Sequence, residues 1–129
     1  RFSMSFNHTV VWLDHLEAHV IGFNNELSQI QVIKSKSDSH LHHKSGSVGS
    51  GHAGADQNYL HEIVKAITGS REVLVTGPGS AKLDLIKHVH HHDAEVAKKI
   101  ICVETTDHPT DGQLLAYAKK YFLKADNML

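Results

Sequence analysis

Residues 72–89 read Glu-Val-Leu-Val-Thr-Gly-Pro-Gly-Ser-Ala-Lys-Leu-Asp-Leu-Ile-Lys-His-Val and join an apolar run to a helical pattern. The run Glu72–Thr76 suits a short strand buried within a sheet. The next four residues, 77–80, are small or turn-forming, and they lead into a helix. We expect one face of that helix to be apolar, formed by Leu83, Ile86 and Val89. A buried strand that turns directly into a helix is typical of the α/β fold class.

Three strand-like segments precede this unit, at 8–13, 17–23 and 27–34. They are rich in β-branched and aromatic residues, and in the third segment Ile30 and Val32 alternate with glutamines. The links between them are only about three residues long, which is too short for a crossover connection. The three segments are therefore predicted to form an antiparallel meander.

Helix and strand alternate in the rest of the chain. Asp56 is a good N-cap for a helix over 57–68. Residues 93–99 are expected to form a turn before a second buried strand, Ile100–Glu104. Residues 110–113 have the spacing of a capping box, which predicts the start of a last helix.

The element order β-β-β-α-β-α-β-α predicts a single α/β domain over 1–129. Its mixed five-stranded sheet, of ribonuclease-H-like architecture, would be flanked by helices. One segment interrupts the pattern: residues 35–55 are rich in Ser, Gly and His and almost free of apolar residues. We expect a flexible loop of about 20 residues there, a length that is usually functional or disordered.

Charge and apolar content exclude several classes of protein. The 129 residues include 13 Lys and Arg, 14 Asp and Glu, and 13 His, for a net charge of −1 at neutral pH. The protein is therefore not constitutively basic, but it becomes strongly cationic in mild acid, where histidines gain protons. No apolar run approaches the roughly 20 residues of a membrane-spanning helix. The single cysteine, Cys102, forms no internal disulfide and is expected in the core, which fits a cytoplasmic protein.

Several segments together resemble one protein family. Residues 73–82, with their strand, small-residue turn and helix, are similar to the middle domain of eukaryotic and archaeal class-1 peptide chain release factors and of Pelota. The strand 101–106 with the helix 112–118, and the hairpin 10–14 with 18–22, resemble the last and first strands of that domain. The chain is similar to the bacterial stand-alone relatives of this domain, which are labelled translational machinery proteins.

This resemblance implies a role in translation. In release factors, a long loop after the third strand carries Gly-Gly-Gln, which promotes hydrolysis of peptidyl-tRNA. The loop expected at 35–55 occupies the equivalent place but lacks that tripeptide, as Pelota also does. The resemblance therefore implies a non-catalytic accessory of the translation machinery that associates with the ribosome or RNA. The residues expected to contact RNA are Lys36, His42, His43, Lys44, Gly49, Gly51 and His52.

Carboxylates leave a second function open, a metal-dependent RNA hydrolase of ribonuclease-H-like type. Such enzymes hold two Mg²⁺ ions with acids from several elements of the sheet and its helices. The candidates here are Asp14, Glu62, Glu104 and Asp107. Asp14 also fits the turn of a hairpin, and Glu62 also fits the exposed face of an amphipathic helix.

Two further groups have both a functional and a structural interpretation. Gly77, Gly79 and Ser80 precede a helix and would hold an RNA phosphate on its N-terminus, or simply form a strand-to-helix turn. His88, His91 and His92 have the helical spacing to share a metal ion, or form a solvated helix end suited to the negative pole of the helix. We expect no cofactor and only adventitious Zn or Ni binding, and a histidine-based metal or pH sensor is a third possible function.

Overall fold

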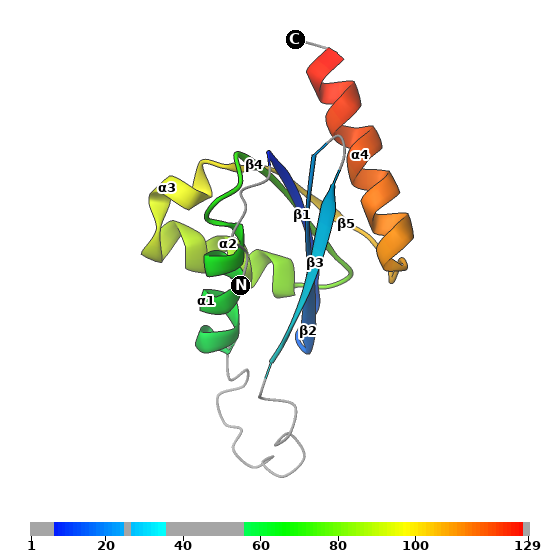
Figure 1. Ribbon diagram of the computed structural model, residues 1–129. Helices are drawn as coiled ribbons and strands as arrows, with labels where there is room; N and C mark the ends of the chain where they lie inside the picture. The colour runs from blue at the N-terminus through cyan, green and yellow to red at the C-terminus, as the bar shows by residue number, and fades with distance from the viewer. Residues whose placement is uncertain (1–6, 25–26, 36–55, 128–129) are drawn as a thin grey trace.

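The computed structural model describes residues 7–24, 27–35 and 56–127, with side chains to residue 123 (Figure 1). Its five strands are β1 (His8–Leu13), β2 (Glu17–Phe23), β3 (Ser28–Lys34), β4 (Glu72–Gly77) and β5 (Ile100–Thr105). Its helices are α1 (Gln57–Ile67), α2 (Ala81–His92), α3 (Ala94–Ala97) and α4 (Asp111–Asn127).

The strands form one mixed sheet in the order β3-β2-β1-β4-β5. The first three pair antiparallel, as short links require, whereas β4 pairs parallel with both β1 and β5. The connection from β3 to β4 contains α1, and the connection from β4 to β5 contains α2 and α3. The predicted α/β fold with a mixed five-stranded sheet is confirmed.

Helices cover both faces of the sheet (Figure 1). Helices α1, α2 and α3 pack on one face, and α4 packs on the other. The alternation of a strand explains how β1 serves both cores. Val11 and Leu13 belong to the core beneath α1 and α2, while Val10 and Trp12 belong to the core beneath α4.

Both predicted helix caps form. The side chain of Asp56 accepts hydrogen bonds from the backbone of Asn58 and Tyr59, at 3.0 and 3.1 Å. At the start of α4, the Thr110 hydroxyl accepts from the Gln113 backbone at 3.1 Å, and the Gln113 side chain accepts from the Thr110 backbone at 2.9 Å. These reciprocal bonds make the expected capping box.

The predicted apolar face of α2 is correct at Val89, which is buried, and at Ile86, which is partly buried against the core, but wrong at Leu83. Leu83 is 52% exposed, and Leu85 and Val89 are fully buried against the sheet. The helix leaves its turn so that Ala81, Leu85 and Val89, four residues apart, line the core. Leu83 lies nearly opposite this stripe because two residues along a helix turn it by about 200°.

The segment after α2 also differs. Residues 93–99, expected as a turn, contain the short helix α3. The Asp93 side chain caps the N-terminus of this helix by accepting a hydrogen bond from the Val96 backbone at 3.3 Å. The strand expected to be buried, β5, is half-exposed: Ile101 and Val103 are 40% and 37% exposed. The physical reason is its place at the edge of the sheet, where it pairs on one side with β4. Within the described residues, no helix is long and apolar enough to cross a membrane.

Candidate functional site

The carboxyl ends of the parallel strands β1, β4 and β5 meet at one edge of the sheet. We call this region the carboxyl edge: residues 12–19, 77–80 and 106–111. The Thr106 backbone donates to the Gly77 carbonyl at 3.1 Å and ties two of these segments together. Ligand sites of α/β proteins commonly lie at such an edge.

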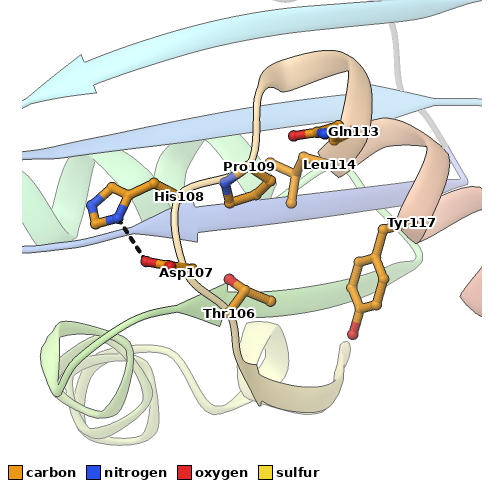
Figure 2. Close-up of a pocket in the computed structure, with 7 residues that line it drawn as sticks. All are labelled: Thr106, Asp107, His108, Pro109, Gln113, Leu114 and Tyr117. Carbon is orange, nitrogen blue, oxygen red and sulfur yellow. Dashed lines mark hydrogen bonds and ion pairs between the residues drawn. The ribbon is translucent and has the colours of Figure 1, made fainter.

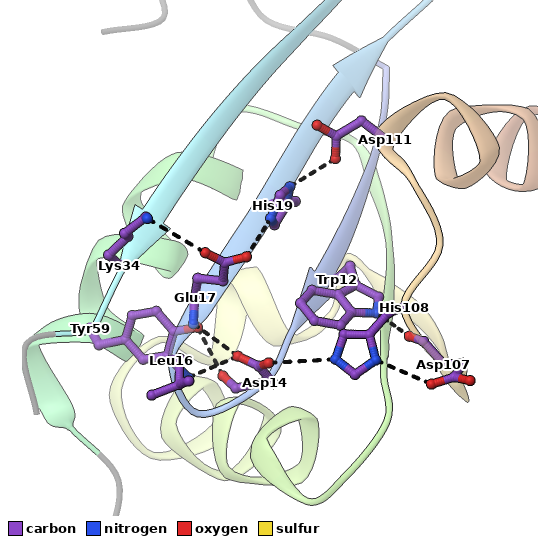
Figure 3. A network of polar contacts seen from close by, with 10 residues as sticks. All are labelled: Trp12, Asp14, Leu16, Glu17, His19, Lys34, Tyr59, Asp107, His108 and Asp111. Carbon is purple, nitrogen blue, oxygen red and sulfur yellow. Dashed lines mark hydrogen bonds and ion pairs between the residues drawn. The ribbon is translucent and has the colours of Figure 1, made fainter. Parts of the chain in front are cut away.

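A histidine there is held between two carboxylates (Figure 3). His19 Nδ1 lies 2.8 Å from Asp111 Oδ1, and His19 Nε2 lies 3.0 Å from Glu17 Oε2. Because carboxylates accept hydrogen bonds, both ring nitrogens donate when the ring is an imidazolium. Burial alone lowers the pKa of His19, but the two carboxylates outweigh burial and raise that pKa. His19 therefore joins β2 to the first turn of α4, and we call His19 with Glu17 and Asp111 the His19 clasp.

A second histidine of this edge lies over the indole of Trp12. The ring of His108 is 5.0 Å from that of Trp12, centroid to centroid. His108 Nδ1 lies 3.1 Å from Asp107 Oδ1, and His108 Nε2 lies 3.9 Å from Asp14 Oδ2. The Trp12 indole N–H donates to the Asp107 carbonyl at 2.7 Å. These contacts fix the connection from β5 to α4 against the end of β1 (Figure 3).

Two hollows border this connection. The first has a volume of about 210 Å³ and is lined by Trp12, Glu17, His19, His108, Pro109, Asp111 and Leu114. The second has about 480 Å³ and is lined by Thr106, Asp107, His108, Pro109, Gln113, Leu114 and Tyr117 (Figure 2). The acids Asp14, Glu17, Asp107 and Asp111 outnumber the cations of this edge, which among the described residues include Lys34, Lys82 at the Gly79 carbonyl and, when protonated, His19. This edge therefore attracts cations and repels phosphate.

The structure brings together two of the four acids of the nuclease hypothesis. Asp14 and Asp107 both lie beside His108. Asp14 also behaves as a turn residue, because its Oδ1 accepts from the Leu16 and Glu17 backbone at 2.8 and 2.9 Å.

The other two acids have partners elsewhere, on opposite sides of the sheet. Glu62 is on α1 and pairs with Lys65 at 3.7 Å. Glu104 is on β5, where it accepts from the Tyr117 hydroxyl of α4. Among the described residues, no three His, Cys, Asp or Glu side chains are placed to hold one metal ion.

The buried tyrosine Tyr59 positions the turn that contains Asp14. Its hydroxyl donates to the Asp14 carbonyl at 2.9 Å. Burial, with Asp14 and Glu17 nearby, raises the pKa of Tyr59 above its usual range. The hydroxyl therefore stays protonated and acts as a donor that ties α1 to the carboxyl edge.

The predicted phosphate turn has a packing explanation. A Cβ at Gly77 would overlap the carbonyl oxygen of Leu13, whereas a Cβ at Gly79 would meet open space. The Ser80 side chain makes no capping hydrogen bond, and Asp84 places a negative charge in the first turn of α2. That carboxylate would repel an anion, whereas Lys82 in the same turn, whose ammonium donates to the Gly79 carbonyl, would attract one.

The predicted histidine group divides into two kinds of residue. His90, His91 and His92 are exposed, as a solvated helix end requires, but His88 is only 8% exposed. His88 Nδ1 lies 2.9 Å from Gln57 Oε1, and the ring of His61 from α1 lies 6.3 Å away. Burial, with His92, His61 and His91 nearby, lowers the pKa of His88.

The predicted RNA contacts lie outside the described residues; they are Lys36, His42, His43, Lys44, Gly49, Gly51 and His52. The residues on either side of that segment are described. The Ser35 hydroxyl donates to Asp56 Oδ2 at 3.1 Å, and the Ser35 backbone donates to the Leu16 carbonyl at 2.8 Å. Ser35 and Asp56 therefore lie together, beside the turn between β1 and β2.

Sequence reasoning missed the residues of the His19 clasp. A signal was present, because Glu17 and His19 are polar residues that alternate with the apolar Ala18 and Val20 on β2. Two polar residues on one face of a central strand call for a polar partner. That partner, Asp111, lies 92 positions away and could not be identified from the pattern.

Similarity to known proteins is detected at the level of structure. No family model and no curated protein matches the sequence. Archaeoglobus fulgidus Pelota matches 88% of the chain with a TM-score of 0.62 and 12% identity. The archaeal translation termination factor aRF1 matches 86% of it with a TM-score of 0.56 and 11% identity. S. cerevisiae Dom34, a translation termination-like factor involved in RNA quality control pathways and interacting with Hbs1, matches 86% with a TM-score of 0.56 and 12% identity.

The chain spans about a third of the length of these proteins, namely 30%, 32% and 31% of Pelota, aRF1 and Dom34. The matches cover 86% or 88% of the chain, so the similarity extends over most of its length. The protein therefore has the fold of one part of Pelota and of the release factor aRF1, as its sequence resemblance predicts.

Proposed function

We propose that this protein is a non-catalytic accessory of the translation machinery that associates with the ribosome or with RNA. The observation that carries the proposal is the shared fold, which extends over 86% or more of the chain in Pelota, aRF1 and Dom34. Two of these are described as a translation termination factor and a translation termination-like factor.

The absence of a hydrolytic motif supports a non-catalytic role. The sequence contains no Gly-Gly-Gln, the tripeptide on which the release reaction of the related family depends. The acids of the nuclease hypothesis do not converge either, because Glu62 and Glu104 lie on opposite faces of the sheet. A two-metal mechanism needs ions only about 4 Å apart.

Charge supports segment 36–55, rather than the carboxyl edge, as the RNA contact. The carboxyl edge is acidic and repels phosphate. Segment 36–55 contains two lysines, four histidines and a single acid, Asp38. Its expected contacts with phosphate come from Lys36, His42, His43 and Lys44, with His52 as a further imidazole and with Gly49 and Gly51 allowing close approach. Because histidines contribute, binding should strengthen in mild acid and weaken with salt.

Co-sedimentation with ribosomes tests this proposal. We expect association at low salt that is stronger at pH 6 than at pH 8. A variant with Lys36, His42, His43 and Lys44 changed to alanine should lose most of it. A matched control changes Lys65, Lys98, His90 and His91 to alanine, which removes two lysines and two histidines from other exposed positions. The control should sediment like the wild type.

Two outcomes would overturn the proposal. One is the absence of ribosome association at both pH values. The other is an equal loss of association in the two quadruple variants, which would show that only total charge matters.

A further inference from the structure

The His88 side chain leaves one ring nitrogen unused. Its Nδ1 lies 2.9 Å from the side-chain oxygen of Gln57. Because an amide oxygen accepts hydrogen bonds, Nδ1 carries the proton, and Nε2 of the neutral ring presents a lone pair. Nε2 is buried and has no hydrogen-bond partner among the residues that the structure describes. A buried acceptor without a partner is unusual and calls for an explanation.

This arrangement is the one that metal-binding histidines adopt. A histidine ligand almost always donates its second ring N–H to an oxygen, which fixes the tautomer and aims the other nitrogen at the ion. Gln57, at the start of α1, plays that orienting part for His88 on α2.

A second imidazole lies one helical turn further along α2. The rings of His88 and His92 are 4.4 Å apart, centroid to centroid, with planes 39° apart. His92 is exposed, so its side chain can turn to bring one nitrogen alongside His88 Nε2. Two histidines at positions i and i+4 of a helix are a common pair of ligands for Zn²⁺.

We propose that His88 Nε2 and His92 together bind one borderline transition-metal ion, such as Zn²⁺ or Ni²⁺, where the end of α2 packs beside α1. Water completes the coordination, because no third His, Cys, Asp or Glu of the described residues is placed to join them. Structural zinc sites use four protein ligands. This ion is therefore exchangeable, and the fold does not depend on it.

Calorimetric titration with Zn²⁺ at pH 7.5 tests the site in four variants of the full chain. His88→Gln and His92→Gln should weaken the tightest binding by about tenfold or more. His90→Gln and His91→Gln are matched controls, since each removes one imidazole from the same helix end. They should keep the wild-type affinity. The histidines elsewhere in the chain are the same in all four proteins, so their background binding cancels.

His92→Gln alone decides the matter if His88→Gln fails to fold, because His92 is exposed. A second readout is the nitrogen NMR spectrum of the imidazoles. Addition of Zn²⁺ should shift Nε2 of His88 while Nδ1 stays protonated. The proposal is overturned if all four variants bind alike, if His91→Gln weakens binding as much as His92→Gln, or if the His88 signals do not move.

Discussion

His19 carries its charge between two acids from different elements, Glu17 of β2 and Asp111 of α4. Its pKa is raised, so the folded state binds the proton more tightly than the unfolded chain does. The stabilisation is therefore complete below pH 6.5, the unfolded value, and is lost as the pH rises through the raised folded value.

We expect His19→Gln to lower the free energy of unfolding by about 1 kcal/mol at pH 6, after allowing for the solvent exposure of both carboxylates. At pH 8.5 the difference should be smaller, because the stabilisation is lost as the pH rises through the raised folded pKa. Urea unfolding of both proteins at the two pH values measures it. A difference that is the same at pH 6 and pH 8.5 would contradict a charged clasp.

The contribution of His88 to the free energy of unfolding should have the opposite pH dependence. Its pKa is lowered by burial and by His92, His61 and His91, while Gln57 bonds its Nδ1. Stabilisation by the neutral ring is present above pH 6.5 and is lost as the pH falls towards the lowered folded value. His88→Gln should therefore cost more stability at pH 7.5 than at pH 5.5, the reverse of His19→Gln.

At the scale of elements, the turn from β4 to α2 is shaped by one glycine. Gly77 lies against the backbone of β1, and a Cβ there would overlap the Leu13 carbonyl. Gly77→Ala should therefore destabilise the protein by roughly 2–3 kcal/mol, as overpacking does. Gly79→Ala, in open space two residues later, is the matched control and should be nearly neutral.

Thermal or urea unfolding of the two glycine variants checks this prediction. Equal stability of Gly77→Ala and wild type would mean that β1 shifts to accommodate the added methyl carbon. It would also remove the packing explanation for that glycine, and with it the reason to prefer a plain turn over a phosphate site.

At the scale of elements, features with a local sequence signal were predicted correctly. The prediction was wrong where a contact with a distant residue decides which side chains are buried. The caps of Asp56 and Thr110 need only their own next residues, and both form. Helix α2 offers two apolar stripes, one with Leu83 and one with Leu85. The choice depends on how the turn at Gly77 meets β1, which the helix sequence does not record.

The strand pairings of the sheet were predictable from sequence, whereas the contacts of the site were not. Element order and short links give the antiparallel and parallel pairings, because chain connectivity limits them. An edge strand such as β5 is as apolar in sequence as the central β4, so its exposure was missed. The clasp of His19 with Asp111 joins residues 92 positions apart, and folding brings them together after both local patterns are satisfied.

At the scale of the whole molecule, we expect the sheet and its helices to fold without segment 36–55. Ser35 and Asp56, on either side of the segment, are joined by a 3.1 Å hydrogen bond. A short Gly-Ser link of about five residues can therefore replace 36–55 without moving β3 or α1. A loop that is about four times shorter has a lower entropy cost of closure, and the difference stabilises the folded state by about 1 kcal/mol.

We therefore expect the shortened protein to unfold at the same or a higher urea concentration than the wild type, and to lose ribosome co-sedimentation at pH 6. Circular dichroism and urea unfolding measure the first effect, and sedimentation measures the second. Loss of stability would mean that 36–55 packs as part of the fold. Retained sedimentation in a stable shortened protein would move the contact to the described surface, where Lys98, Lys99 and Lys119 are among the exposed or partly exposed cations to test next.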